Sequence, residues 1–281
     1  MSDHTQRASL PPRTKPPRLA AGRARALGLP TRGTTNANRL RRVDRWIVAT
    51  QVPRLRDAAR PLVVDLGYGA SAVTTLELVE RLAPEVPGLE TVGLEIDPER
   101  VAAVAEHRDP PRVDFRVGGF ELAGLRPVLV RAFNVLRQYD EESAGRAWDT
   151  MRAGLAPGGM VVEGTCDEWG RRATWVALDE DGPLTLTLAA RVSDLQRPSD
   201  LAERLPKALI HHNVPGQPVH TFLSAFDAAW AAAAGLSTFG PRQRWAAAVQ
   251  ALADDGWSLV GSTRRWKHGE MTVRWSAVAP V

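Results

Sequence analysis

Cysteine is almost absent from the 281-residue sequence, and this scarcity limits the sites that it can build. Cys166 is the only one. A single thiol cannot form a disulfide within the chain, and it cannot supply the several thiolates of a structural zinc centre. His211 and His212 are not followed by another ligand at metal-binding spacing. We therefore expect no metal.

Long apolar stretches are also missing. No run is long enough to cross a bilayer, and the N-terminal segment is charged without the apolar core of a secretory signal. Hydrophobic residues make up 44% of the chain, which is enough to bury a sizeable core. We expect a cytoplasmic globular protein with no membrane partner. The sequence does not define its oligomeric state.

Lysine occurs only three times, so arginine supplies most of the positive charge. The first 60 residues hold 14 of the 36 Lys and Arg but only 3 of the 32 Asp and Glu. This segment carries a net charge of +11, and the remainder carries −7. A basic segment of this kind can contact phosphates, which makes RNA a possible partner. A coding bias toward arginine and alanine explains the same excess without nucleic acid.

The chain divides into three parts by composition. Residues 1–30 are rich in Pro, Arg and Ala, which predicts a disordered basic tail. Residues 31–60 form an N-terminal cap, with a helix expected over 39–59. Residues 61–281 make up the main domain.

Short apolar runs alternate with helical patterns in the first half of this domain. Strands are predicted over 62–64, 91–96, 113–117, 128–133 and 160–164, with helices between them. This alternation predicts an α/β fold, a Rossmann-like, doubly wound and mostly parallel sheet.

The order of elements changes after the fifth strand. Residues 165–255 read as an insertion, a β-hairpin over 174–178 and 184–188 followed by a helical lid. Two further strands, over 257–262 and 271–279, close the domain, and the last is expected to run antiparallel.

A glycine turn follows the first strand, and this turn is the strongest indication of a ligand site. Gly67 and Gly69 stand where the backbone must approach a ligand closely, and Glu95 ends the second strand. A carboxylate there can accept two hydrogen bonds from a ribose diol. The pattern fits an adenosine-containing ligand, and it fits NAD as well as S-adenosylmethionine. A tight turn beside a surface glutamate is the purely structural alternative.

Four motifs in order separate the two cofactors. Between residues 63 and 164 the chain contains Val-Val-Asp-Leu-Gly-Tyr-Gly, Val-Gly-Leu-Glu-Ile-Asp, Asn-Val-Leu and Leu-Ala-Pro-Gly-Gly-Met-Val-Val. This arrangement resembles the class I S-adenosylmethionine-dependent methyltransferases, particularly the small-molecule type. The resemblance covers about 100 residues.

The resemblance implies a role for each matching residue. Asp65 would order the loop or a water beside the methionine ammonium, and Gly67 and Gly69 would let the backbone close on the cofactor. Glu95 would hold the ribose hydroxyls, and Ile96 would pack on adenine.

The later motifs add three residues to the expected cofactor site. Gly119 and Phe120 would lie beside the adenine ring, and Asn134 would line the cofactor. The family often has Gly-Asp after the third strand, whereas this chain has two glycines there, so the contact to the adenine amine is lost or passes to Glu121.

No motif identifies the methyl acceptor. His211 and His212 are the candidate catalytic bases, because imidazole titrates near neutral pH and both lie in the expected lid. We expect a small-molecule acceptor. Three alternatives stay open: an RNA methyltransferase that uses the basic arm, an NAD-dependent oxidoreductase, and a cofactor-binding protein without turnover.

Overall fold

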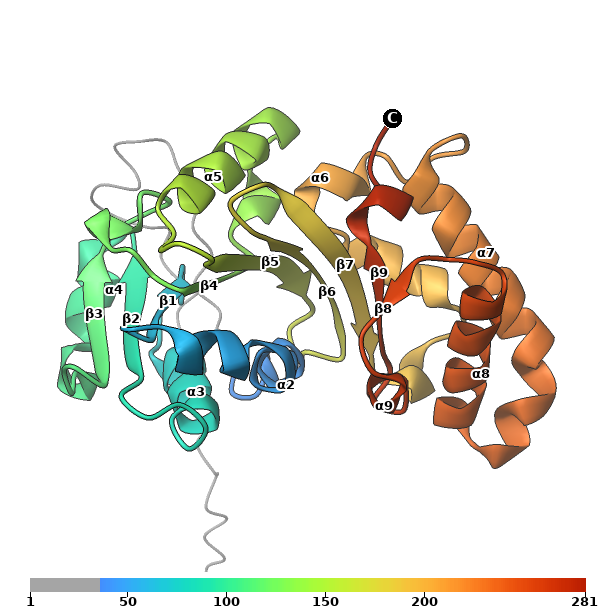
Figure 1. Cartoon of the computed structure of the whole chain (residues 1–281), viewed down its shortest axis with the longest axis horizontal. Coiled ribbons are helices and arrows are strands. Elements are labelled where there is room, and N and C mark those ends of the chain that lie inside the picture. The colour runs from blue at the N-terminus through green and yellow to red at the C-terminus, as the bar shows by residue number, and fades with distance from the viewer. Residues whose placement is uncertain (1–35) are drawn as a thin grey trace, which may run out of the picture.

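A nine-stranded mixed sheet is the centre of the computed structural model, which describes residues 36–281 (Figure 1). Its strand order is β3-β2-β1-β4-β5-β6-β7-β9-β8. The tail predicted for residues 1–30 lies outside the described residues. No helix within residues 36–281 combines the length and apolar character needed to cross a membrane.

The first five strands pair in parallel. They are β1 (Leu62–Leu66), β2 (Glu90–Glu95), β3 (Val113–Val117), β4 (Leu129–Phe133) and β5 (Met160–Cys166). The order 3-2-1-4-5 places β1 at the centre, where the direction of winding reverses. The parallel α/β core expected from the sequence is confirmed.

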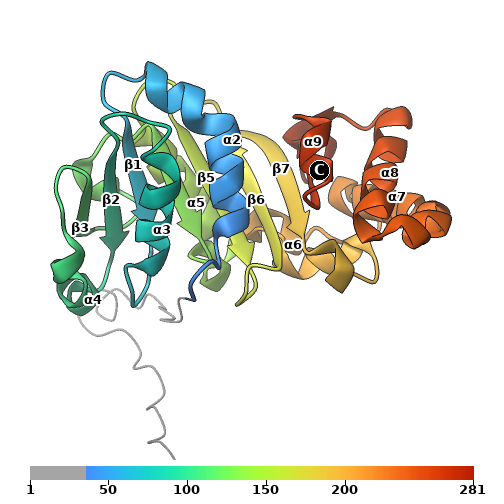
Figure 2. The same ribbon diagram turned by 90° about the horizontal axis from the view of Figure 1, so that it is seen from below.

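Helices cover both faces of this parallel half (Figures 1 and 2). α2 (Arg41–Asp57) and α3 (Val73–Leu82) lie on one face, α5 (Glu141–Ala153) covers the other, and α4 (Pro98–Ala103) packs beside β2 and β3. Alternate residues of one strand therefore enter different cores. In β1, Leu62 and Val64 join the α5 side, and Val63 joins the α2 and α3 side.

The expected hairpin is present as β6 (Arg172–Leu178) and β7 (Pro183–Ala190). It joins the main sheet, because β6 pairs antiparallel with β5. The reason lies in its side chains: Val176 packs into the α5-side core, while Trp175 and Ala177 pack into the α2-side core. A strand that is apolar on both faces is most stable inside a sheet. The last strands, β8 (Leu259–Val260) and β9 (Glu270–Arg274), run antiparallel, as expected.

The remaining helices are α6 (Lys207–Ile210), α7 (Pro218–Ala232), α8 (Pro241–Asp254) and α9 (Thr263–Trp266). α7 and α8 lie side by side at the antiparallel end of the sheet (Figure 1). Phe226 and Trp245 hold them together, with ring centroids 4.9 Å apart. These aromatic residues fill a core.

A carboxyl group is buried inside the α5-side core. Glu163 stands at the middle of β5, is 1% exposed, and has no hydrogen-bond partner for either carboxyl oxygen among residues 36–281. Burial raises its pKa to about 8, because the charged form loses its water. The group is therefore protonated at neutral pH.

This burial predicts a pH-dependent stability. The pKa in the unfolded chain is near 4.5, so the unfolded state ionises first as pH rises, and Glu163 lowers the free energy of unfolding between about pH 4.5 and pH 8. Glu163→Gln removes this loss. Urea unfolding should show the variant gaining up to about 4 kcal/mol over wild type on going from pH 5 to pH 8. The exposed Glu142→Gln is the control and should show no such gain. An equal difference at both pH values contradicts the prediction.

Candidate functional site

The glycine turn after β1 lies at the carboxyl edge of the parallel strands. Gly67 and Gly69 both adopt positive φ, +72° and +87°, which side-chain-bearing residues rarely do. The Gly67 amide donates to the Leu94 carbonyl at 2.7 Å, which fixes the turn to the end of β2. A Cβ at position 67 would lie 2.6 Å from Val135 Cγ2, so a larger residue there disturbs packing as well as any ligand.

Glu95 ends β2 directly beside this turn. Its Oε2 accepts a hydrogen bond from the Gly69 amide at 3.1 Å, and its Oε1 accepts one from the Ile96 amide at 2.9 Å. The side chain is 4% exposed, and burial raises its pKa, while Arg100 at 3.6 Å and the backbone donors oppose that rise. The structure thus brings Glu95 and the glycine turn together.

Aromatic side chains lie near the ends of β3 and β4. The rings of Phe120 and Tyr139 meet edge to face, with centroids 5.5 Å apart. Burial raises the pKa of the Tyr139 hydroxyl, and the negative charge of Glu95 adds to the rise. Tyr139 and Glu95 therefore belong to the same electrostatic environment. The Gly119 amide donates to Glu121 Oε1 at 3.0 Å. Glu121 therefore stands beside Gly119.

Asn134 follows β4 in a left-handed conformation, with φ of +60°. Asparagine tolerates this region better than most residues. Its side chain is held in place, because Oδ1 accepts a hydrogen bond from the Cys166 amide at 2.9 Å and Nδ2 donates to Cys166 Sγ at 3.3 Å. The lone cysteine thus has a structural contact at the edge of the site.

A small cavity of about 60 Å³ joins several of the predicted residues. It is lined by Arg39, Leu40, Asp65, Leu66, Gly67, Tyr68, Gly69, Thr74, Phe133 and Asn134. Arg39 and Leu40 come from the segment before α2, which covers this part of the site.

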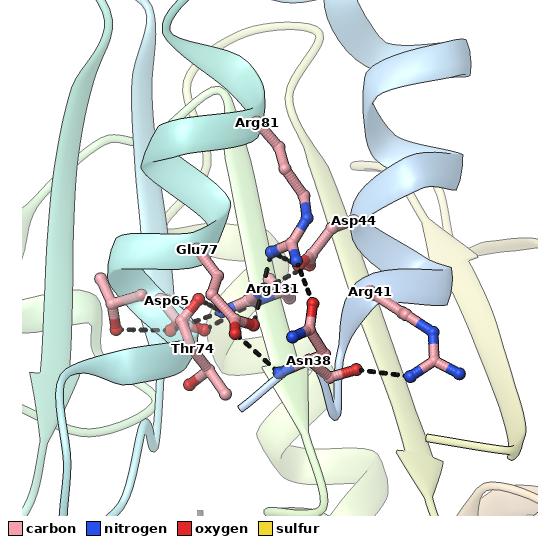
Figure 3. Close-up of polar contacts among 9 residues, drawn as sticks. Asn38, Arg41, Asp44, Asp65, Thr74, Glu77, Arg81 and Arg131 are labelled. Carbon is pink, nitrogen blue, oxygen red and sulfur yellow. Dashed lines mark hydrogen bonds and ion pairs between the residues drawn. The ribbon is translucent and has the colours of Figure 1, made fainter. Parts of the chain in front are cut away.

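Asp65 points into a buried ion pair with Arg131 (Figure 3). Arg131, at the middle of β4, donates from Nε to Asp65 Oδ1 at 2.9 Å and from Nη2 to Oδ2 at 2.7 Å. The Thr75 hydroxyl also donates to Oδ2, at 2.7 Å. Arg131 is 0% exposed and Asp65 is 2% exposed. Asp65 therefore ties β1 to β4 and to α3.

A second carboxylate completes the network. Asp44 of α2 accepts a hydrogen bond from Arg131 Nη1 on one oxygen and from Arg81 Nη1 on the other, the latter at 2.9 Å (Figure 3). Burial raises the pKa of Asp44 to about 6, although Arg131 and Arg81 oppose the shift. Arg81 also donates to the Asn38 side chain at 3.0 Å. The network thus fixes both α2 and the segment that covers the cavity.

Sequence reasoning missed Arg131 and Asp44. Arg131 is the only charge in the apolar run 128–133, and a lone charge in a buried strand requires a partner. Asp44 lies one turn from Leu40 on the apolar face of α2. The sequence therefore shows a buried charge in the strand and a buried charge on the helix, but it does not show that the two residues pair with each other.

The two candidate histidines lie at the end of α6. His212 Nε2 is 2.6 Å from Glu141 Oε1, at the start of α5. His211 is exposed, and neither histidine lines the small cavity. Their role as catalytic bases stays a prediction.

Known proteins resemble this chain only in part. No family model and no curated protein sequence matches it. Among solved structures, human N-acetylserotonin methyltransferase in complex with SAM aligns with 43% of this chain and 35% of its own, at 22% identity and a TM-score of 0.31. A cyclopropane synthase from Mycobacterium tuberculosis aligns with 42% of this chain and 41% of its own, at 18% identity and a TM-score of 0.32. A probable spermidine synthase from Corynebacterium glutamicum aligns with 50% of this chain and 53% of its own, at 20% identity and a TM-score of 0.33.

These alignments cover about half or less of each solved chain. Similarity at this level does not assign an activity, and the three proteins are named for different activities.

The contribution of the buried Asp44–Arg131–Asp65 network to stability can be tested by mutation. Arg131→Leu leaves Asp44 and Asp65 without their shared cation, and removing one partner of a buried ion pair typically costs about 3–5 kcal/mol. We expect that loss in the free energy of unfolding measured by urea titration. Arg112→Leu breaks an exposed pair with Asp109 and should cost less than about 1 kcal/mol. Similar losses in both variants would show that the network contributes little.

Proposed function

We propose that this chain binds S-adenosylmethionine at the carboxyl edge of β1 and β2 and transfers its methyl group to an acceptor. The observation that carries the proposal is the position of Glu95, a buried carboxylate hydrogen-bonded to the amide of Gly69 in the adjacent glycine turn. The motif order supports the same choice of ligand over NAD.

The donor and acceptor groups at this edge suit such a nucleoside. Glu95 offers carboxylate oxygens to a ribose diol, and Ile96 and Phe120 offer apolar surface to adenine. Gly67 and Gly69 keep Cβ atoms out of the turn, and Asn134 lines the small cavity with them. The bound cofactor supplies a methyl group on a sulfonium, an electrophile that needs no metal.

The residues of this chain act mainly by positioning. Asp65 has both oxygens engaged by Arg131, so its part is to fix the loop that Gly67 begins. Holding donor and acceptor in line can supply much of the acceleration of a displacement. A base is needed only for an acceptor that loses a proton, and His211 and His212 remain the candidates for that step.

The acceptor expected from the sequence is a small molecule, and this stays a prediction. A cofactor-binding protein without turnover is the second candidate. Two results together would favour this second candidate. Calorimetry would show that S-adenosylmethionine binds, and no component of a cell extract would receive a labelled methyl group.

Glu95→Gln tests the proposed site. The amide keeps the size of the side chain but removes the charge and one acceptor oxygen, and hydrogen bonds to charged groups contribute about 1.5–3 kcal/mol. We expect isothermal titration calorimetry to show S-adenosylmethionine binding about 10- to 100-fold more weakly to the variant than to wild type.

The matched control is Glu99→Gln, an exposed residue four positions along the chain. It should bind S-adenosylmethionine like wild type. NAD is titrated in parallel. Absence of heat with S-adenosylmethionine and its demethylated product, or tighter binding of NAD, overturns the proposal.

A further inference from the structure

A second, larger depression lies beside the candidate site. It has a volume of about 770 Å³ and runs between α2, α8 and α9, whose places are seen in Figure 1. We call it the arginine groove. Its lining residues are Arg41, Arg42, Arg45, Val48, Ala49, Arg81, Arg191, Arg242, Arg265, His268 and Glu270.

Among residues 36–281, the groove has more arginines than carboxylates that pair with them. Three of its arginines have carboxylate partners: Arg265 pairs with Glu270, Arg81 with Asp44, and Arg191 with Asp194 at 3.5 Å. The other four have no carboxylate within ion-pair distance among residues 36–281. They are Arg41, Arg42, Arg45 and Arg242.

These arginines repel one another. Burial lowers the pKa of Arg42 to about 10, and the charges of Arg41 and Arg45 contribute, while Glu270 and Asp167 only partly oppose the shift. The pKa of His268 is lowered by burial and by Arg265, Arg242, Arg45 and Arg42. Charges crowded in this way reduce stability unless an anion joins them.

Neutral groups hold two of the arginines in place. Arg42 donates from Nε to the Gly170 carbonyl at 3.0 Å and from Nη1 to the His268 carbonyl at 3.2 Å. Arg41 donates to the Asn38 carbonyl at 3.4 Å. Carbonyl acceptors orient a guanidinium without cancelling its charge. The groove is therefore partly preorganised for an anionic ligand.

The groove and the small cavity are lined in part by the same segment of the chain, residues 39–42. Neighbouring residues of this segment line each of them: Arg39 and Leu40 line the cavity, and Arg41 lines the groove. Asn38, directly before this segment, accepts hydrogen bonds from two groove residues, Arg41 and Arg81 (Figure 3). A ligand in the groove therefore lies near the segment that lines the candidate cofactor site.

We propose that the arginine groove binds the phosphodiester backbone of a nucleic-acid strand. Guanidinium groups suit phosphate oxygens, because they donate two parallel hydrogen bonds and stay charged. A strand fits better than one phosphorylated metabolite, since the positive charge spreads over α2, the end of β7, α8 and α9. Binding of the strand is independent of the proposed function. The further idea that the strand carries the methyl acceptor rests on the proposed function.

The test compares two charge-matched double variants of the full chain. Arg45→Glu with Arg242→Glu changes two groove arginines that pair with no carboxylate in the described part of the chain. Arg112→Glu with Arg146→Glu changes two arginines in exposed pairs outside the groove. The probes are fluorescein-labelled 20-nucleotide single strands of RNA and of DNA with one sequence. Anisotropy is measured between 50 and 200 mM salt, without cofactor.

We expect both strands to bind wild type and the control variant alike, and the groove variant at least about tenfold more weakly. Loss of two phosphate contacts should also reduce the slope of log K against log salt by about 1.4. A preference for RNA or DNA identifies the source of the strand, and either supports the proposal.

Three outcomes overturn the proposal: no binding by wild type, equal weakening in both double variants, or full affinity in the groove variant, which assigns binding to residues 1–35. Displacement of the strand by equimolar inorganic pyrophosphate also overturns it, in favour of a small phosphorylated ligand. Calorimetry with S-adenosylmethionine on the same variants shows separately whether the proposed cofactor site is intact.

Discussion

The carboxyl edge of this sheet is organised by one buried cation held between two carboxylates. Arg131 reaches Asp65 on the neighbouring strand and Asp44 on α2, and it also donates to the Thr74 carbonyl of α3 at 2.9 Å. A guanidinium with no exposure is tolerated only when most of its donors are satisfied. This requirement fixes how two strands and two helices meet, and the glycine turn begins two residues after Asp65.

Local patterns were sufficient to predict the parallel half of the fold. Apolar runs such as 62–64 are typical of strands buried on both faces, and Pro98 begins α4, where the missing amide costs nothing. Gly67 and Glu95 could be placed together from the sequence, because the carboxyl ends of neighbouring parallel strands share one edge. In the structure the contact is made by Gly69, 26 positions before Glu95, whose amide donates one hydrogen bond to the Glu95 carboxylate.

Contacts between distant segments could not be predicted in the same way. Arg131 and Asp44 are 87 positions apart, and no local period relates a strand residue to a cap-helix residue. The pairing of β6 with β5 is also invisible in the hairpin sequence, which shows that two strands pair but not what lies beside them. The arginine groove combines α2 with residues more than 140 positions later, so the sequence placed its charge in an N-terminal arm and missed its convergence with Arg191, Arg242 and Arg265.

The position of Asp44 has a consequence for the smallest autonomous form of this fold. The repeating strand and helix units begin at β1, which suggests that α2 is an accessory that could be trimmed away. A chain starting at Leu62 would lose Asp44, leave Arg131 with one counter-charge, and uncover Trp175 where Trp46 now packs on it at 5.8 Å. The N-terminal helix is therefore an integral part of the core, and the boundary of the folded unit lies before Arg41.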